Sequence, residues 1–275
     1  MANTLILGAG WLGTPIAQTL VDQGHQVTVT RRSQAKLDEF PISCVSTALL
    51  DLNESDSAQQ LSELIAQYQI ECIVGTFPPG FRQGNGDEYA LQWERLVSAA
   101  KENGVGKVLM VSSTTVYPNL AVDMKEEDAT LALAKNNAHF SDNARIMLQA
   151  EQYVIDSGID YVIVRCSGLI GSDRHPSRFA MRLKQVSSNA PANMLHQDDA
   201  VAATVFALNN IDNDVVNATT PTTVSKAEFY QAAISKNDLD IALPPITDTP
   251  DKRILADKLI ELGYQFQFKS TLDAL

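Results

Sequence analysis

The sequence predicts an α/β fold: a doubly wound parallel sheet with helices on both faces, followed by a smaller, irregular carboxyl-terminal lobe. Through the first two-thirds of the chain, short apolar and β-branched runs alternate with longer segments of helical periodicity. The apolar runs are nearly continuous, which is typical of strands buried on both faces. With 275 residues, 45% of them hydrophobic, the chain can bury a large core.

Six strands and five intervening helices can be placed in chain order. The strands are expected at TLIL (4–7), QVTVT (26–30), CVSTALL (44–50), CIVGTF (72–77), KVLMVSS (107–113) and DYVIVRC (160–166). The helices are expected around residues 16–21 and at AKLDEF (35–40), SAQQLSELIAQY (57–68), EYALQWERLVSAAKE (88–102) and ARIMLQAEQYVIDS (144–157). The alternation ends near Arg165, so residues 1–165 are predicted to form the sheet domain. Residues 166–275 are predicted to form mostly the smaller lobe, with some elements returning to the sheet.

The smaller lobe contains two further predicted helices. Asp198 is a plausible N-cap for one of them, with Asp199 in its first turn, where the helix dipole favours an anion. The segment DKRILADKLIELGY (251–264) predicts the other, closed by Gly263. Its apolar stripe comprises Ile254, Leu255, Leu259 and Leu262. Lys252 and Arg253 at its start could reach the cleft.

The segment GAGWLG (8–13) directly follows the first strand and precedes a helix and a second strand. Gly8 allows a tight turn, Gly10 lets a pyrophosphate approach the backbone, and Gly13 lets the helix pack closely on the sheet. The amino terminus of the helix then faces the phosphates. This context predicts a Rossmann-type dinucleotide site. Its first segment comprises Gly8, Gly10, Trp11, Leu12 and Gly13.

The end of the second strand indicates which dinucleotide is bound. A free ribose 2′-hydroxyl is usually bound by an acidic residue, whereas the 2′-phosphate of NADP is bound by arginine. This chain has Arg31, Arg32 and Ser33 at that point and no acid. We therefore expect NADP rather than NAD. The alternative is that both arginines are ordinary solvated surface residues.

Composition excludes some classes of partner. The formal net charge of −12 repels phosphate backbones and anionic membrane surfaces, so neither nucleic acid nor membrane is expected. No apolar run approaches the roughly 20 residues of a bilayer-spanning helix. The amino-terminal stretch lacks the features of a secretory signal, and a cytoplasmic monomer or homodimer is expected. The cysteines, which lie far apart in apolar runs, are assigned to the core: Cys44, Cys72 and Cys166.

Five motifs occur together in one order: GAGWLG, VSSTTVYP (111–118), AEQ (150–152), RCSGLIGSDRHPSRF (165–179) and NMLHQDDAVAA (193–203). In these motifs the chain resembles the extended short-chain dehydrogenase/reductase family, NAD(P)-dependent epimerases and dehydratases of sugar nucleotides. The resemblance implies catalytic roles for Ser113 and Tyr117. It also implies a small-molecule substrate, either a sugar nucleotide or another anion. The cofactor contacts that it implies are Asp51, Leu52, Phe77, Pro78, Ser112, Cys166 and Ser167.

The chain departs from that family in its acid/base pair. The family uses a tyrosine as general acid/base, with a lysine four residues later that lowers the tyrosine's pKa. In the usual register these positions fall on Asn143 and Met147, and none of the seven tyrosines is followed at that spacing by a lysine. One explanation is an enzyme whose acid/base role has moved to Tyr117 or His139, with Arg145 as the cation, although His139 and Arg145 are also typical surface residues. The other is a catalytically silent protein that senses or scaffolds NADP.

A cationic loop contains Arg174, His175 and Arg178, which could bind a phosphate or carboxylate of the substrate. Ordinary solvation of the loop is the alternative. No metal site is predicted, because the histidines lack the spacing of metal ligands. They are His25, His139, His175 and His196.

Overall fold

The computed structural model describes residues 2–81, 84, 86–236 and 241–275, and the chain forms two compact units. Unit 1 comprises residues 1–112, 142–164 and 204–215. Unit 2 comprises residues 113–141, 165–203 and 216–275. The units are interleaved along the chain. Residues 113–141, which follow the fifth predicted strand, belong to unit 2.

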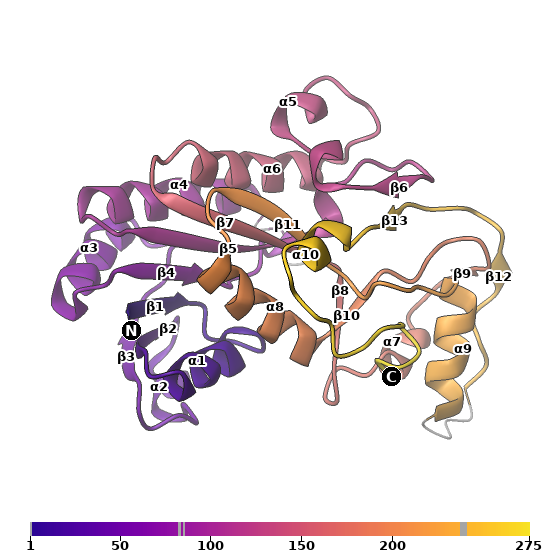
Figure 1. Cartoon of the computed structure of the whole chain (residues 1–275), viewed down its shortest axis with the longest axis horizontal. Coiled ribbons are helices and arrows are strands. Elements are labelled where there is room, and N and C mark those ends of the chain that lie inside the picture. Colours follow the sequence, from indigo (N-terminus) through magenta and orange to yellow (C-terminus); the bar gives the residue numbers. More distant parts are fainter. Residues whose placement is uncertain (1, 82–83, 85, 237–240) are drawn as a thin grey trace. The chain divides into compact units, whose positions relative to one another are not determined.

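The sheet contains seven strands in the order β11-β7-β5-β4-β1-β2-β3 (Figure 1). Their bounds are β1 Asn3–Leu7, β2 Gln26–Arg31, β3 Ser46–Leu49, β4 Cys72–Gly75, β5 Lys107–Ser113, β7 Asp160–Cys166 and β11 Asp214–Ala218. The pairings β1/β2, β1/β4, β2/β3 and β4/β5 are parallel. This confirms the predicted Rossmann-type sheet. The strand order reverses between β1 and β4, and at such a switch point a crevice opens beyond the strands' carboxyl ends.

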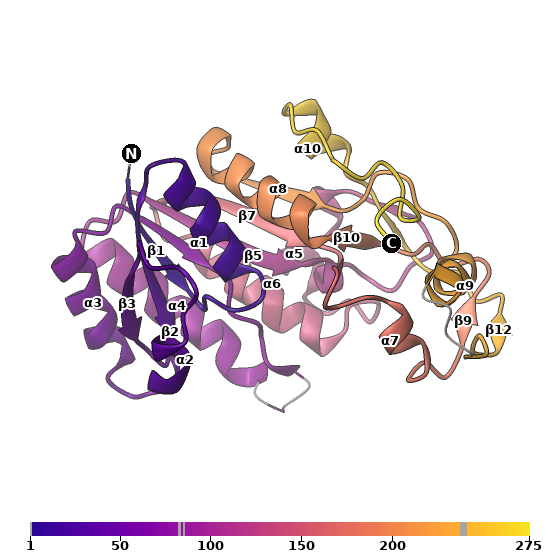
Figure 2. The ribbon, with the colours of Figure 1, turned by 90° about the horizontal axis from the view of Figure 1, so that it is seen from below.

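Both faces of the sheet in unit 1 carry helices. Their bounds are α1 Gly13–Asp22, α2 Gln34–Asp38, α3 Ser57–Tyr68, α4 Gly86–Glu102 and α6 Asp142–Ile155. Helices α3, α4 and α6 lie side by side on one face, and α1 lies on the other (Figures 1 and 2). Trp93 of α4 is fully buried, and its ring occupies the space where a side chain at Gly75 would stand. Such close packing leaves β4 little room for larger residues.

Unit 2 is built from short elements. These are β6 Asp123–Met124, α5 Leu131–Ala134, β8 Gly168–Ile170, α7 Ser177–Ala180, β9 Val186–Ser187, β10 Met194–His196, α9 Lys226–Lys236, β12 Ile246–Thr247, β13 Arg253–Ile254 and α10 Asp257–Glu261. The strands form three parallel pairs, β8/β10, β9/β12 and β6/β13. Helix α8 (Gln197–Asn210) begins within the residues of unit 2 and ends within those of unit 1.

The predicted carboxyl-terminal helix is wrong in its first half. Backbone hydrogen bonds from Arg253 to Val122 and from Leu255 to Met124 extend this segment along β6, so α10 begins only at Asp257. Pairing with a distant strand therefore overrides the local helical pattern. Leu262, a member of the predicted stripe, is 44% exposed just beyond the helix.

The predicted N-cap at Asp198 is also wrong. Helix α8 begins at Gln197, and the Asp198 N–H donates to Nδ1 of His196 at 3.2 Å. Asp199 lies in the first turn as expected. Its buried carboxylate accepts hydrogen bonds from the Gln267 and Phe268 N–H groups and is 2.9 Å from the Tyr264 hydroxyl. Asp199 thus ties α8 to the carboxyl-terminal segment.

The cysteines divide differently from the prediction. Cys72 and Cys166 are buried, and burial raises the pKa of each thiol to about 12. Cys44 is exposed, because it lies in the turn before β3 rather than in the strand. Among the described helices, none combines the length and the apolar character that crossing a membrane requires.

The first testable prediction concerns Lys107 at the start of β5. Its Nζ donates to the Leu208 and Ile211 carbonyls at 2.6 and 2.8 Å and pairs with Asp212 at 2.6 Å. We expect Lys107→Met to lower the free energy of unfolding by about 1–3 kcal/mol, because charged hydrogen bonds to the end of α8 are lost. Urea denaturation measures the change. Lys101→Met, at an exposed lysine of α4, is the matched control and should change stability far less; equal losses would contradict the role of Lys107.

Candidate functional site

Unit 1 contains a cleft of about 470 Å³ beyond the carboxyl ends of β1 and β2. Many residues predicted to bind a cofactor line it: Gly8, Gly10, Arg31, Arg32, Ser33, Asp51, Leu52, Phe77 and Pro78. Sequence reasoning gave no role to several other lining residues: Leu7, Thr30, Lys36, Leu50, Asn53 and Gln92. Five segments of unit 1 that are separated in sequence therefore line one cavity.

The other predicted cofactor residues lie elsewhere. Trp11, Leu12, Gly13 and Ser112 belong to unit 1 but do not line the cleft, whereas Cys166 and Ser167 belong to unit 2. Leu12 and Gly13 are buried at the start of α1. The Ser112 hydroxyl donates to the buried Glu151 carboxylate at 2.6 Å. A role in cofactor binding stays a prediction for this group.

The glycine turn is held by hydrogen bonds to two neighbouring strands. The Thr76 hydroxyl donates to the Gly8 carbonyl at 2.9 Å, and the Gly8 N–H donates to the Thr30 hydroxyl at 3.3 Å. Gly8 has φ +86°, which favours glycine, and a side chain there would touch Phe77 at 3.0 Å. The turn therefore depends on the backbone freedom of Gly8.

Gly13 and Gly10 are glycines for different reasons. A Cβ at Gly13 would lie 2.6 Å from the Thr76 hydroxyl oxygen and 2.9 Å from the Gly8 carbonyl, so packing of α1 excludes any side chain. A Cβ at Gly10 would meet no such obstacle, since its nearest neighbour is 3.6 Å away. Gly10 lines the cleft. Its bare backbone therefore fits close approach by a ligand rather than by the chain itself.

The beginning of α1 also suits a phosphate. The residue before the helix, Leu12, provides no capping side chain for its first N–H groups. Within the first turn the Thr14 N–H donates to the Gly10 carbonyl at 3.0 Å, so it is mainly the positive end of the helix dipole that favours an anion here. The residues present therefore fit the diphosphate of a dinucleotide.

Arg31, at the end of β2, lines the cleft as a cation that the described chain does not neutralise. Its Nη2 donates to the Thr14 hydroxyl at 3.2 Å, and the guanidinium lies 5.4 Å from the centre of the Phe40 ring. Its Nε is buried and has no hydrogen-bond partner among the described residues. Burial lowers the pKa of Arg31. The guanidinium charge at the cleft therefore favours an anion there.

Ring packing and local hydrogen bonds support the remaining walls of the cleft. The Phe77 ring stacks on Trp93 with centroids 4.9 Å apart, and Tyr89 packs edge-on against both rings. Elsewhere in the lining, Asp51 accepts two hydrogen bonds from Asn53, whose side chain in turn accepts from Gln92 at 2.7 Å. The cleft is thus preformed by packing and by local hydrogen bonds.

The two predicted catalytic residues belong to unit 2 and differ in their surroundings. Ser113 is partly exposed, and its hydroxyl oxygen accepts from the Thr115 N–H at 3.1 Å. Tyr117 is 1% exposed. Its hydroxyl donates to Asn217 Oδ1 at 2.6 Å and accepts from Arg165 Nη1 at 3.2 Å. Burial raises the pKa of Tyr117, although the Arg165 charge opposes the shift.

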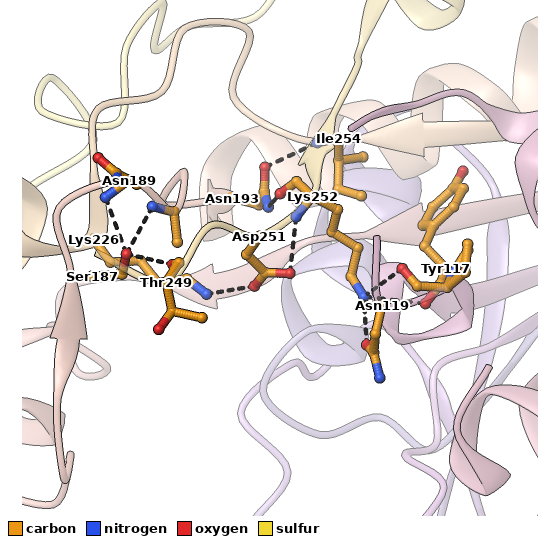
Figure 3. A network of polar contacts seen from close by, with 12 residues as sticks. Tyr117, Asn119, Ser187, Asn189, Asn193, Lys226, Thr249, Asp251, Lys252 and Ile254 are labelled. Atoms are coloured by element: carbon orange, nitrogen blue, oxygen red, sulfur yellow. Dashed lines mark hydrogen bonds and ion pairs between the residues drawn. The ribbon is translucent and has the colours of Figure 1, made fainter. Parts of the chain in front are cut away.

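Unit 2 has its own cleft of about 300 Å³. Its lining comprises Thr114, Thr115, Asn119, Ser141, Asn193, Met194, Lys226 and Lys252. Lys252 Nζ donates to the carbonyls of Tyr117 and Pro118 and to Asn119 Oδ1, at 3.0–3.1 Å (Figure 3). Lys252 therefore lines the cleft of unit 2 and holds the loop after Ser113 in place. Arg253 instead forms a two-pronged ion pair with Asp123.

The other predicted cationic residues contact residues close to them in sequence or lie exposed. Arg178 donates to the Asp173 carbonyl at 2.7 Å, and His175 Nδ1 lies 2.9 Å from the Ser177 hydroxyl. Neither residue lines either cleft, nor does Arg174. His139 is exposed, and Arg145 pairs with Asp142 at 2.8 Å. The described residues contain no cluster of three or more histidine, cysteine, aspartate or glutamate side chains that could hold a metal ion.

Comparison with known proteins agrees with the geometry. Residues 8–211 match a family described as NAD(P)H-binding. The chain is 27% identical to protein YeeZ of Escherichia coli over 281 residues, covering 99% of this chain and 98% of YeeZ.

Solved structures share the fold across nearly the whole chain. WbmH of Bordetella bronchiseptica in complex with NAD+ has a TM-score of 0.76 at 20% identity, covering 100% of this chain and 96% of WbmH. UDP-glucose 4-epimerase of Thermus thermophilus, in complex with NAD, has a TM-score of 0.77 at 16% identity, with coverages of 99% and 97%. The dTDP-glucose 4,6-dehydratase of Bacillus anthracis, also with NAD, has a TM-score of 0.78 at 15% identity, with coverages of 100% and 95%.

The glycine turn yields the second prediction. We expect Gly13→Ala to lower the free energy of unfolding by about 1–3 kcal/mol, because the new methyl group must displace the Gly8 backbone. Gly10→Ala has room for its methyl group and should stay close to wild type. Chemical denaturation of both variants, side by side, measures the difference. Equal stability of the two variants would refute this assignment of the glycines.

Proposed function

The chain belongs to the NAD(P)H-binding family, and from this premise we propose that it is an NADP-dependent enzyme. Its reaction is of the epimerase, dehydratase or carbonyl-reductase kind, and its substrate is a small carbohydrate-like molecule. The cofactor lies in the cleft of unit 1, with its diphosphate against residues 8–13. UDP-glucose 4-epimerase and dTDP-glucose 4,6-dehydratase have the same fold, which supports the reaction class.

The observation that carries the choice of NADP is the guanidinium of Arg31, which lines this cleft without an ion pair to a described carboxylate. Lys36 and Arg32, both exposed, line the same cavity and add positive potential. An arginine fork matches the oxygens of a phosphate, whereas a ribose hydroxyl would leave the guanidinium charge uncompensated. Asp51 also lines the cleft, and its Oδ1 accepts two hydrogen bonds from Asn53.

The chain's own residues would position the substrate. When bound, the nicotinamide ring supplies hydride transfer. The partly exposed Ser113 hydroxyl would donate a hydrogen bond to a substrate oxygen, and Lys252 would keep its loop in place. The sequence suggests Tyr117 as the acid/base residue, but its buried and doubly bonded hydroxyl supports a positioning role instead. A phenol whose pKa is raised by burial is also a poor base.

A second candidate is a catalytically silent NADP sensor. The absence of a tyrosine followed four residues later by lysine favours it, as does the burial of Tyr117. In that case the cofactor would bind as proposed above, but the protein would turn over no substrate. The two candidates therefore differ in turnover and agree in cofactor affinity.

Cofactor choice gives the third prediction. We expect Arg31→Met to weaken NADPH binding at least tenfold, which corresponds to about 1.4 kcal/mol, and to change NADH binding less than threefold. The methionine keeps an apolar stem but loses the guanidinium. Titration of the nicotinamide fluorescence measures both affinities. Arg182→Ala, at an exposed arginine of unit 2, should change neither, and an equal loss of NADPH and NADH affinity in Arg31→Met would exclude a phosphate contact.

Turnover gives the fourth prediction. With sugars, sugar acids, sugar phosphates and nucleotide sugars as substrates, we expect NADPH oxidation or NADP reduction that falls at least 100-fold in Ser113→Ala. Tyr117→Phe should keep activity within about tenfold, since loss of a general acid/base costs about 100- to 10,000-fold. Absorbance at the nicotinamide band follows the reaction. A larger loss in Tyr117→Phe, with unchanged NADPH affinity, would restore its catalytic role. Binding without turnover across the panel would favour the sensor.

A further inference from the structure

The cleft of unit 2 contains an unusual group of charges. Lys226 and Lys252 both line the cleft. Asp251 directly precedes Lys252 in the chain segment before β13. Lys226 Nζ is 2.7 Å from Asp251 Oδ2, and Asp251 Oδ1 accepts the Lys252 N–H at 2.8 Å (Figure 3). Two ammonium groups and one carboxylate leave the cluster with one net positive charge. A cleft that retains such a charge favours an anion.

The two lysines differ in the hydrogen bonds that they can still make. An ammonium group has three protons to donate. Lys252 Nζ has three acceptors, namely the Tyr117 and Pro118 carbonyls and Asn119 Oδ1. Among the described residues, Lys226 Nζ has one acceptor, the Asp251 carboxylate. Lys226 therefore has donors to spare for a ligand, whereas Lys252 is committed to the loop and contributes mainly its charge.

Apart from its ion pair with Asp251, Lys226 lies at an unfavourable position for a cation. It is the first residue of α9, where the helix dipole opposes a positive charge. The Lys226 and Asp251 side chains are each 35% exposed, so solvent only partly screens them. Burial, together with the charge of Lys226, lowers the pKa of Lys252, although Asp251 opposes that shift. Two lysines that line one half-buried cleft are an arrangement that favours an anion.

The rest of the lining suits a hydroxylated molecule of modest size. Thr114, Thr115 and Ser141 bring hydroxyl groups to the cleft, and Met194 brings an apolar surface. The Asn193 amide is occupied, since it donates to the Lys252 carbonyl at 2.9 Å and accepts from the Ile254 N–H at 3.0 Å (Figure 3). A volume of about 300 Å³ lies at the lower end of the range for small-molecule pockets.

We propose that this cleft binds the carboxylate or phosphate of a small sugar acid or sugar phosphate, through the free donors of Lys226 and the charge of Lys252. The inference rests on the proposed function, because it names the substrate class of that enzyme. The proposed anion site lies at the start of α9, whereas the sequence suggested the loop of Arg174, His175 and Arg178. A single sugar ring with one anionic group fits the cleft better than a nucleotide sugar does.

Calorimetric titration of the full chain without cofactor tests the proposal. The probes are glucuronate for a carboxylate, glucose 6-phosphate for a phosphate, and glucose as the neutral reference. We expect at least one anionic sugar to bind at least tenfold tighter than glucose. Lys226→Gln should weaken that binding at least tenfold, and Lys226→Arg should restore most of it. The control is Lys236→Gln, which removes an exposed lysine at the other end of α9 and should bind like wild type.

Three results would overturn the proposal: no preference of either anionic sugar over glucose, wild-type affinity in Lys226→Gln, or an equal loss in Lys236→Gln. Circular dichroism of each variant verifies that it is folded, and Lys226→Arg provides the second test at the same position. NADPH affinity, measured separately by fluorescence, should be unchanged in Lys226→Gln. Failure of wild-type protein to bind NADPH would refute the proposed function, whereas the calorimetry decides the anion site independently.

Discussion

The close contact between the start of α1 and the end of β4 is the constraint on which the cofactor cleft depends. The Thr76 hydroxyl donates to the Gly8 carbonyl, and Gly13 approaches the same oxygens so closely that no side chain fits. This contact turns the bare backbone of Gly10 toward the cleft. Because β2 runs beside β1 in parallel register, Arg31 at its end then lines the same cavity. One packed turn thus brings together the bare backbone of Gly10 and the guanidinium of Arg31.

Unit 2 follows a different principle, since charged hydrogen bonds rather than regular elements hold its cleft. Lys252 fixes the loop that follows Ser113, and Asn193 joins β10 to the segment before β13. Arg165 donates to the Glu126 and Ala129 carbonyls and to the Tyr117 hydroxyl. Buried networks of this kind are stable only when their members are satisfied. They explain how a unit of short strands can present ordered side chains to a ligand.

Local patterns predicted the parts of the site that are close in sequence. The glycine turn and the arginines at the end of β2 could be located because one strand–turn–helix–strand unit contains them. Gln92 and Asn53 contact each other across 39 positions, and no periodicity reports such a contact. Lys226 and Lys252 likewise line one cleft although they are far apart in sequence. Strand β11, which is five residues long, follows the part of the chain where strands and helices alternate regularly, so no local pattern indicated it. In the carboxyl-terminal segment, the pairing of β13 with β6 replaces the first half of the helix that the local pattern favours.

The central claim is that the cleft of unit 1 holds NADP through the turn of residues 8–13 and the guanidinium of Arg31. A crystal structure of the full chain grown with NADPH tests it most directly. The account predicts diphosphate density beside Gly10 and a 2′-phosphate within hydrogen-bond distance of Arg31. Cofactor density outside this cleft, or a 2′-phosphate directed away from Arg31 into solvent, would contradict it.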